Sequence, residues 1–133
     1  MMLKIVLAVS GLLFLLAGFA ILLDPNGFYA AYQLGIPFNT NWQNELRANG
    51  SLLIATGTLI AAGALIEKFS RVSLYVGLIQ YGAIVLGRLL SLLVDGTPQH
   101  ALLVAMMLEA FTWLALLTAF IRSVRSGQGT VAH

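Results

Sequence analysis

The sequence of 133 residues has no cysteine and few charged residues. Without cysteine the chain forms no disulfide, no thiolate metal site and no thiol redox centre. It has two histidines, His100 and His133, so a bis-histidine haem site is not expected. Only 9% of the residues are charged, whereas a soluble domain carries about 25%. We therefore expect no metal, no cofactor, and a surface that faces lipid.

The charge balance also argues against nucleic acid as a partner. The formal net charge is only +2, and the basic residues lie beside apolar runs instead of forming a stripe. A nucleic-acid-binding surface needs clustered Lys and Arg to neutralise phosphates. Membrane lipid is the partner that this composition favours, because 59% of the residues are hydrophobic.

Four long apolar stretches cover residues 3–23, 46–66, 72–94 and 101–121. Each is close to the roughly 20 residues that a helix needs to cross a hydrocarbon core of ~30 Å. Helix is expected because every backbone N–H and C=O must be paired within the segment where water is absent. The sequence thus predicts an all-α integral membrane protein, a single domain over residues 1–133 that forms an antiparallel bundle of four transmembrane helices. Residues 123–133 are expected to be a disordered tail.

Basic residues predict the orientation of these spans. The first and third links, residues 24–45 and 95–100, contain no Lys or Arg. The basic flanks lie at the N-terminus, in the second link and after the fourth span: Lys4, Lys68, Arg71, Arg122 and Arg125. By the positive-inside rule both termini are cytoplasmic. We expect a multi-pass membrane protein.

The first link is rich in aromatic residues, namely Phe28, Tyr29, Tyr32, Phe38 and Trp42. Aromatic rings favour the headgroup level of a membrane, and the spacing allows a short interfacial helix. Two interpretations stay open for this link: a membrane anchor, or a lid over an opening between the helices.

Small residues recur at heptad spacing within the spans. Gly11 and Gly18 lie in the first span, and Gly50 and Gly57 lie in the second. Small residues let helix backbones approach closely in lipid, and a seven-residue repeat keeps one seam turned to its partner. The pattern predicts a compact, left-handed bundle.

Arg88 and Glu109 are charged residues within long apolar runs. A charge at the bilayer centre costs roughly 2.5–3.5 kcal/mol on insertion scales, so such residues commonly face each other, a ligand or water. Arg88 lies ~10 Å and Glu109 ~13 Å from the outer ends of their spans, at 1.5 Å per residue. We expect them to pair, with Glu45 as a second carboxylate. The predicted polar cluster comprises Glu45, Arg47, Asn49, Tyr81, Arg88, Ser91, Asp95 and Glu109.

Several functions fit such a cluster. It could bind a lipid-like or small anionic ligand in an outward-facing pocket, or it could be an ion pair that only fixes helix register. The protein could also be a non-catalytic subunit of a larger membrane complex, through a membrane-protein partner or a homo-oligomer. An enzyme with Glu45 or Glu109 as general acid/base is the least favoured, because no nucleophile, metal set or phosphate loop accompanies them. We assign no catalytic and no metal-binding residue.

Three segments resemble a family of small bacterial four-span membrane proteins defined as a domain of unknown function, which is distantly similar to DoxX-like proteins. The first segment is Asn44-Glu45-Leu46-Arg47-Ala48-Asn49-Gly50, at the start of the second span. The second joins Gly87-Arg88-Leu89-Leu90-Ser91 to Asp95-Gly96-Thr97-Pro98, and the third is Glu109. The resemblance implies the same four-helix bundle, the same polar cluster and a location in the bacterial inner membrane. The distant similarity to DoxX-like proteins implies accessory roles in membrane redox complexes, by analogy of fold alone.

Overall fold

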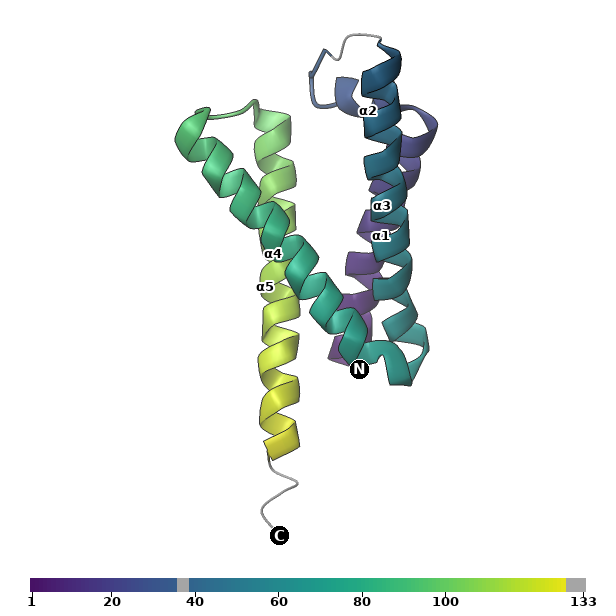
Figure 1. The fold of residues 1–133 in the computed structure, drawn as a ribbon. Coiled ribbons are helices and arrows are strands. Elements are labelled where there is room, and N and C mark those ends of the chain that lie inside the picture. The colour runs from purple at the N-terminus through teal and green to yellow at the C-terminus, as the bar shows by residue number, and fades with distance from the viewer. Residues whose placement is uncertain (36–38, 129–133) are drawn as a thin grey trace.

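The computed structural model describes residues 1–35 and 39–128, and it contains no strand in those ranges (Figure 1). Phe38, one of the aromatic residues of the first link, lies outside them. The helices are α1 (Met2–Leu23), α2 (Pro25–Ala30), α3 (Thr40–Leu65), the 3-10 turn η1 (Glu67–Phe69), α4 (Ser70–Val94) and α5 (His100–Gln128). Four of these helices, α1, α3, α4 and α5, are long and apolar enough to cross a membrane.

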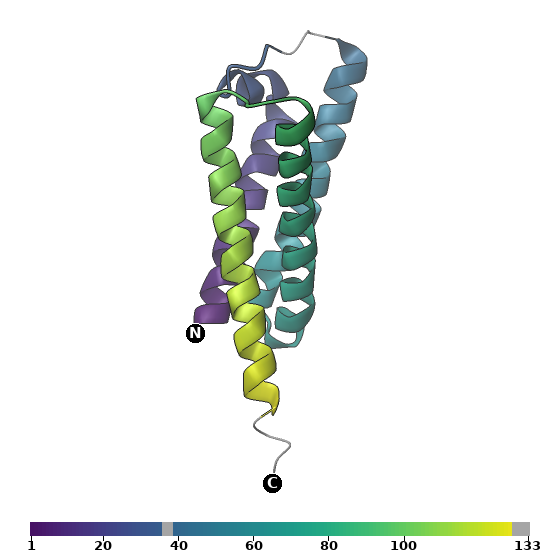
Figure 2. The same ribbon diagram turned by 90° about the vertical axis from the view of Figure 1, so that its left-hand side faces the viewer.

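The long helices form two antiparallel pairs. Helix α1 packs along α3, and α4 packs along α5 (Figure 1). The pairs meet near η1, while the far end of α4 leans away from α3 (Figures 1 and 2). The N-terminus, η1 and the last turns of α5 lie at one end of the molecule, and α2 lies at the other. We call these the inner end and the outer end.

Glycine explains the close approach of α1 and α3. A Cβ atom on Gly18 would lie 2.7 Å from the carbonyl oxygen of Gly50, and one on Gly57 would lie 2.9 Å from that of Gly11. Real Cβ atoms do not approach backbone atoms so closely, so the two backbones are in contact because these positions lack side chains. The heptad pattern therefore identified a true helix seam.

The core lies toward the inner end, where both pairs meet. Leu7, Ile60, Leu74 and Leu116 are all almost fully buried, one from each long helix. Outside this core the helix surfaces carry many exposed apolar side chains, such as Leu86 and Phe111. A water-facing monomer rarely exposes such large apolar patches.

Two helix ends differ from the predicted spans. Helix α3 begins at Thr40, well before residue 46, because the side chain of Asn39 accepts a hydrogen bond from the backbone N–H of Asn41 and caps the helix. Helix α5 continues to Gln128, so residues 123–128 are helical and not part of a disordered tail. The remainder of the predicted tail lies outside the described residues.

Candidate ligand-binding site

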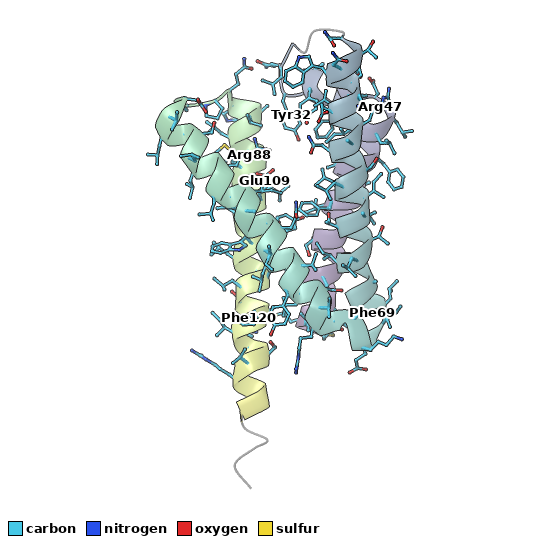
Figure 3. All side chains as sticks on the ribbon, in the orientation of Figure 1. Tyr32, Arg47, Phe69, Arg88, Glu109 and Phe120 are labelled. Atoms are coloured by element: carbon cyan, nitrogen blue, oxygen red, sulfur yellow. The ribbon has the colours of Figure 1, made fainter. Side chains whose placement is uncertain are left out.

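The most specific polar contact of the chain joins Arg88 on α4 to Glu109 on α5. Nε of Arg88 lies 3.1 Å from Oε2 of Glu109, and Nη2 lies 3.2 Å from Oε1. Two parallel N–H···O bonds fix the orientation of both side chains as well as their charges. The pair faces the space between the two helix pairs, in the outer half of the molecule (Figure 3).

The pair is not sealed inside a packed core. The side chains of Arg88 and Glu109 are 34% and 22% exposed. Both line a cavity of about 880 Å³ that lies between α1, α2, α4 and α5. Binding sites for small molecules usually have volumes of about 300–1,000 Å³, so this cavity is in the upper part of that range.

The walls of the cavity are mainly apolar. Helix α1 contributes Leu13, Leu16, Ala17 and Ile21. Helix α5 contributes Ala101, Val104, Ala105 and Leu108. Three of these wall residues, Leu16, Val104 and Leu108, are exposed, so the cavity is not sealed. A few polar groups in a large apolar pocket are typical of a site that orients an otherwise hydrophobic molecule.

Tyr81 forms the inner floor of the cavity. Its ring stacks on Phe14 with centroids 4.2 Å apart, and both residues line the cavity. Its hydroxyl donates a hydrogen bond to the carbonyl oxygen of Ser10 at 2.8 Å. The tyrosine therefore joins α4 to α1 directly beneath the open space.

Helix α2 covers the outer end of the cavity. Phe28, Tyr29 and Tyr32 all line it. The short helix begins after Asp24, whose carboxylate accepts a hydrogen bond from the backbone N–H of Gly27 at 3.0 Å. Asn26 in turn accepts a bond from the side-chain amide of Gln43 at 2.8 Å, which ties α2 to α3. These contacts hold α2 at the outer end of the cavity.

Tyr29 is electrostatically coupled to the ion pair. Burial raises the pKa of the Tyr29 phenol above its ordinary value of 10.0, and the positive charge of Arg88 opposes that rise. The phenol is therefore uncharged at neutral pH and lies close enough to feel the guanidinium. The outer end of the cavity thus has a neutral hydroxyl group in addition to the ion pair.

The structure brings together only part of the predicted polar cluster. Tyr81, Arg88, Ser91 and Glu109 line the cavity. Asp95 is linked to it indirectly, because its carboxylate accepts a hydrogen bond from the Ser91 hydroxyl at 2.9 Å.

The three predicted residues of α3 do not line the cavity. Glu45 and Asn49 are exposed, and within the described ranges Glu45 forms no ion pair with Arg88. Arg47 instead donates hydrogen bonds to the carbonyl oxygens of Leu22 and Leu23, the last residues of α1. The same face of α3 does reach the cavity at Leu53, one turn after Asn49. Because the outer end of α4 leans away from α3, Glu45 and Asn49 stay exposed.

The sequence did not predict that residues of α1 form part of the cavity wall. No polar or charged residue marks Leu13, Leu16 or Ala17, and their role depends on the tilt of α4 away from them. The sequence does carry a signal for Tyr29 and Tyr32, because the aromatic content of the first link allows a lid as one of its two interpretations.

The family comparison covers the whole site. The model described as "Domain of unknown function (DUF4345)" matches residues 2–120. The chain belongs to the DUF4345 family. No curated protein and no solved structure matches it. The prediction of a domain-of-unknown-function family is confirmed. The matched range includes α2, Tyr81, Arg88 and Glu109, so the ion pair and its cavity lie within the DUF4345 domain.

This DUF4345 site has groups that can bind a ligand. In residues 1–35 and 39–128 no group of three or more His, Asp or Glu residues could hold a metal ion. What the site offers is a fixed guanidinium–carboxylate pair, a large apolar volume, and the hydroxyl groups of Tyr29, Tyr32, Tyr81, Ser91 and Thr112. Such a site can hydrogen-bond a polar head while it surrounds a hydrophobic tail.

Proposed function

We propose that this chain is a multi-pass protein of the bacterial inner membrane that binds a lipid-like molecule in the cavity beside Arg88 and Glu109. The observation that carries the proposal is the position of the ion pair at the wall of an apolar cavity of about 880 Å³. A pair that served only to fix helix register would be expected to lie in tightly packed surroundings.

The distribution of basic residues supports an outward-facing cavity. Four basic residues lie near the ends of α1, η1, α4 and α5 that form the inner end with the N-terminus. They are Lys4, Lys68, Arg71 and Arg122. By the positive-inside rule that end is cytoplasmic, which places α2 and the cavity in the outer leaflet. Four membrane-crossing helices in a left-handed bundle accord with the heptad glycines of α1 and α3.

We infer that a ligand would enter between α1 and α5. Leu16 on α1 and Val104 and Leu108 on α5 are exposed and also line the cavity. In a bilayer these residues would face acyl chains, so a lipid-like molecule could pass between α1 and α5 without crossing water. Its head would reach Arg88 and Glu109, while its tail stayed along the apolar walls.

The proposal can be tested by identifying molecules that remain with the protein after purification in a neutral detergent. Native mass spectrometry should find an added mass on the protein, and extraction should recover an amphiphile. A Gly87→Leu variant should lose that mass. Gly87 lines the cavity, and a Cβ atom there would meet no atom within 4 Å, so the larger side chain can occupy the cavity without disturbing the helix packing.

Ala83→Leu is the matched control, because Ala83 is exposed on the same helix and does not line the cavity. It adds similar apolar volume and should leave the bound mass unchanged. If wild type and both variants retain the same amphiphiles in the same amounts, the cavity is not the binding site. If wild type retains none and is always isolated with a constant protein partner, a structural subunit is the better interpretation.

A further inference from the structure

The charges of the proposed site cancel within the site itself. Among the described residues, two charged side chains line the cavity, those of Arg88 and Glu109. Hydrogen bonds join these two side chains to each other. Asp95 lies outside the cavity and is bonded to Ser91. Asp24 is bonded to the backbone of α2, and Arg47 is bonded to the end of α1. The cavity therefore offers no unbalanced positive charge to an anion.

The pair still has hydrogen-bonding capacity for a ligand. A guanidinium has five N–H donors. Within the described part of the chain Arg88 uses two of them, one on Nε and one on Nη2, and both bond to Glu109. The Nη1 group donates to no described residue, and Arg88 lines the cavity. A carboxylate accepts about four hydrogen bonds, and each oxygen of Glu109 receives one from Arg88. The pair can thus donate to one group of a ligand and accept from another.

On the basis of the proposed function, we propose that the site selects lipids whose head group is uncharged and carries both a hydroxyl donor and a carbonyl or hydroxyl acceptor. An acceptor oxygen of the head would receive a hydrogen bond from Nη1 of Arg88. A hydroxyl of the head would donate to a carboxylate oxygen of Glu109. A glycerol monoester has both groups on adjacent carbons, and a fatty acid anion has acceptors alone.

Electrostatics explains why an ionised head is excluded. A carboxylate or phosphate next to Arg88 would also lie next to Glu109, and like charges in apolar surroundings repel strongly. The anion would also lose its water without gaining a counter-charge of its own. The Tyr29 phenol adds hydrogen-bonding capacity but no charge, because burial raises its pKa. The apolar walls of α1 and α5 supply the remaining contacts.

The test compares two lipids that share one acyl chain, monoolein and oleate. Both are offered in equal amounts to the purified full-length protein in a neutral detergent, at a pH alkaline enough to ionise the oleate carboxyl, and the bound masses are counted by native mass spectrometry. Wild type should retain monoolein over oleate by at least about tenfold. Glu109→Gln leaves Arg88 with an uncancelled charge, and it should lower this ratio by about tenfold or more.

Two further variants separate charge from fold. In Arg88→Gln/Glu109→Gln the site is again neutral, so the preference for monoolein should return. Glu45→Gln removes a carboxylate of α3 that does not line the cavity, and it should keep the wild-type ratio. A low ratio in the double variant would overturn the inference, because it would show that lost structure and not charge changed the selection.

The outcomes for wild type also distinguish this inference from the proposed function. If wild type retains oleate as well as or better than monoolein, and Gly87→Leu abolishes that binding, the charge selection is wrong while lipid binding in the cavity stands. If wild type retains neither lipid, both proposals fail. A monoolein preference that Glu109→Gln leaves unchanged would equally overturn selection by the ion pair.

Discussion

The hydroxyl of Tyr81 on α4 donates a hydrogen bond to the backbone carbonyl oxygen of Ser10 on α1, at 2.8 Å. The Tyr81 ring also stacks on Phe14, one turn further along α1. These contacts join the two helix pairs at the level where they begin to diverge. Below Tyr81 the pairs share a packed core, and above it they enclose the cavity.

Tyr81→Phe should therefore lower the free energy of unfolding by about 0.5–1.5 kcal/mol, the net contribution of one buried hydrogen bond. The ring and its stacking on Phe14 remain, so the loss is expected to stay in this range. The matched control is Tyr75→Phe, because Tyr75 is half-exposed on the same helix and its contact is a ring contact with Phe120. Denaturant titration in detergent would measure both. Equal effects of the two substitutions would contradict a special role for the Tyr81 hydroxyl.

Replacing glycine by alanine should change the stability of the protein in opposite directions at two positions. Gly57→Ala should destabilise the protein by about 1–3 kcal/mol, because the new methyl group would lie 2.9 Å from the carbonyl oxygen of Gly11 and force α1 and α3 apart. Gly87→Ala should be neutral or stabilise it by up to about 1 kcal/mol, since no atom lies within 4 Å and alanine favours a helix. Melting temperatures of the two variants against wild type would check the sign. Destabilisation of the same size at both positions would mean that the α1–α3 seam has no special packing.

These two substitutions also show what the sequence could predict. The α1–α3 seam follows from Gly11, Gly18, Gly50 and Gly57 alone, because small residues at heptad spacing have few roles other than close helix contact. The contact between Arg88 and Glu109 could be predicted for a similar reason. Two opposite charges at similar depth in neighbouring apolar helices have few other partners.

The parts of the site that escaped prediction depend on the geometry of whole helices. Arg47 was expected in the polar cluster, but the last carbonyl groups of α1 lack partners within their own helix, and its long side chain reaches them. The cavity itself exists because α4 leans away from α1 and α3. Helix tilt of this kind is set by packing along the full length of each pair, and no local pattern in the sequence records it.

The lid over the cavity should depend on the cap of α2. Asp24→Ala removes the hydrogen bond from the N–H of Gly27, which costs about 0.5–2 kcal/mol of helix stability. A looser α2 should let monoolein leave the cavity about fivefold faster, the factor that corresponds to ~1 kcal/mol. Dissociation can be followed by diluting a preloaded protein and recording bound mass over time.

Ser70→Ala provides the control for this experiment. It removes a side-chain hydrogen bond at the inner end, where the Ser70 hydroxyl donates to the carbonyl oxygen of Gly63 at 2.6 Å. Ser70 begins α4 beside η1, away from α2, and does not line the cavity, so the dissociation rate should stay at the wild-type value. Faster release in both variants would show that general loss of stability, and not the lid, controls release.

Ionisation of Tyr29 should report the charge of Arg88. Burial holds the Tyr29 phenol protonated above its ordinary pKa of 10.0, and Arg88 works against this rise. In a spectrophotometric titration, the difference between wild type and Tyr29→Phe should therefore show one phenol that ionises above pH 10.0. In an Arg88→Gln background the same difference should move to still higher pH, because the opposing positive charge is gone.

The sign of the corresponding stability change follows from the raised pKa. The unfolded chain releases the Tyr29 proton more readily than the folded chain, so ionisation favours unfolding once the pH exceeds 10.0. Wild type should then lose more stability than Tyr29→Phe on passing from neutral pH to that range. Arg71→Gln is the control for nonspecific charge, since Arg71 lies at the inner end of α4. A shift of the Tyr29 titration in Arg71→Gln as large as in Arg88→Gln would argue against direct coupling.

The ion pair itself allows a test of its contribution to stability. Arg88→Leu leaves the carboxylate of Glu109 without its partner in apolar surroundings, and it should cost about 1–3 kcal/mol. The estimate is below the roughly 3–5 kcal/mol for breaking a fully buried pair, because the two side chains keep 34% and 22% exposure and water can reach them. Arg88→Leu/Glu109→Leu should regain more than half of that loss, because no unpaired charge remains. Unfolding midpoints of the wild type, both single variants and the double variant form a complete cycle.

A double variant as unstable as Arg88→Leu would mean that the pair contributes to stability in its own right. A stable double variant that no longer retains monoolein would place the importance of Arg88 and Glu109 in ligand binding.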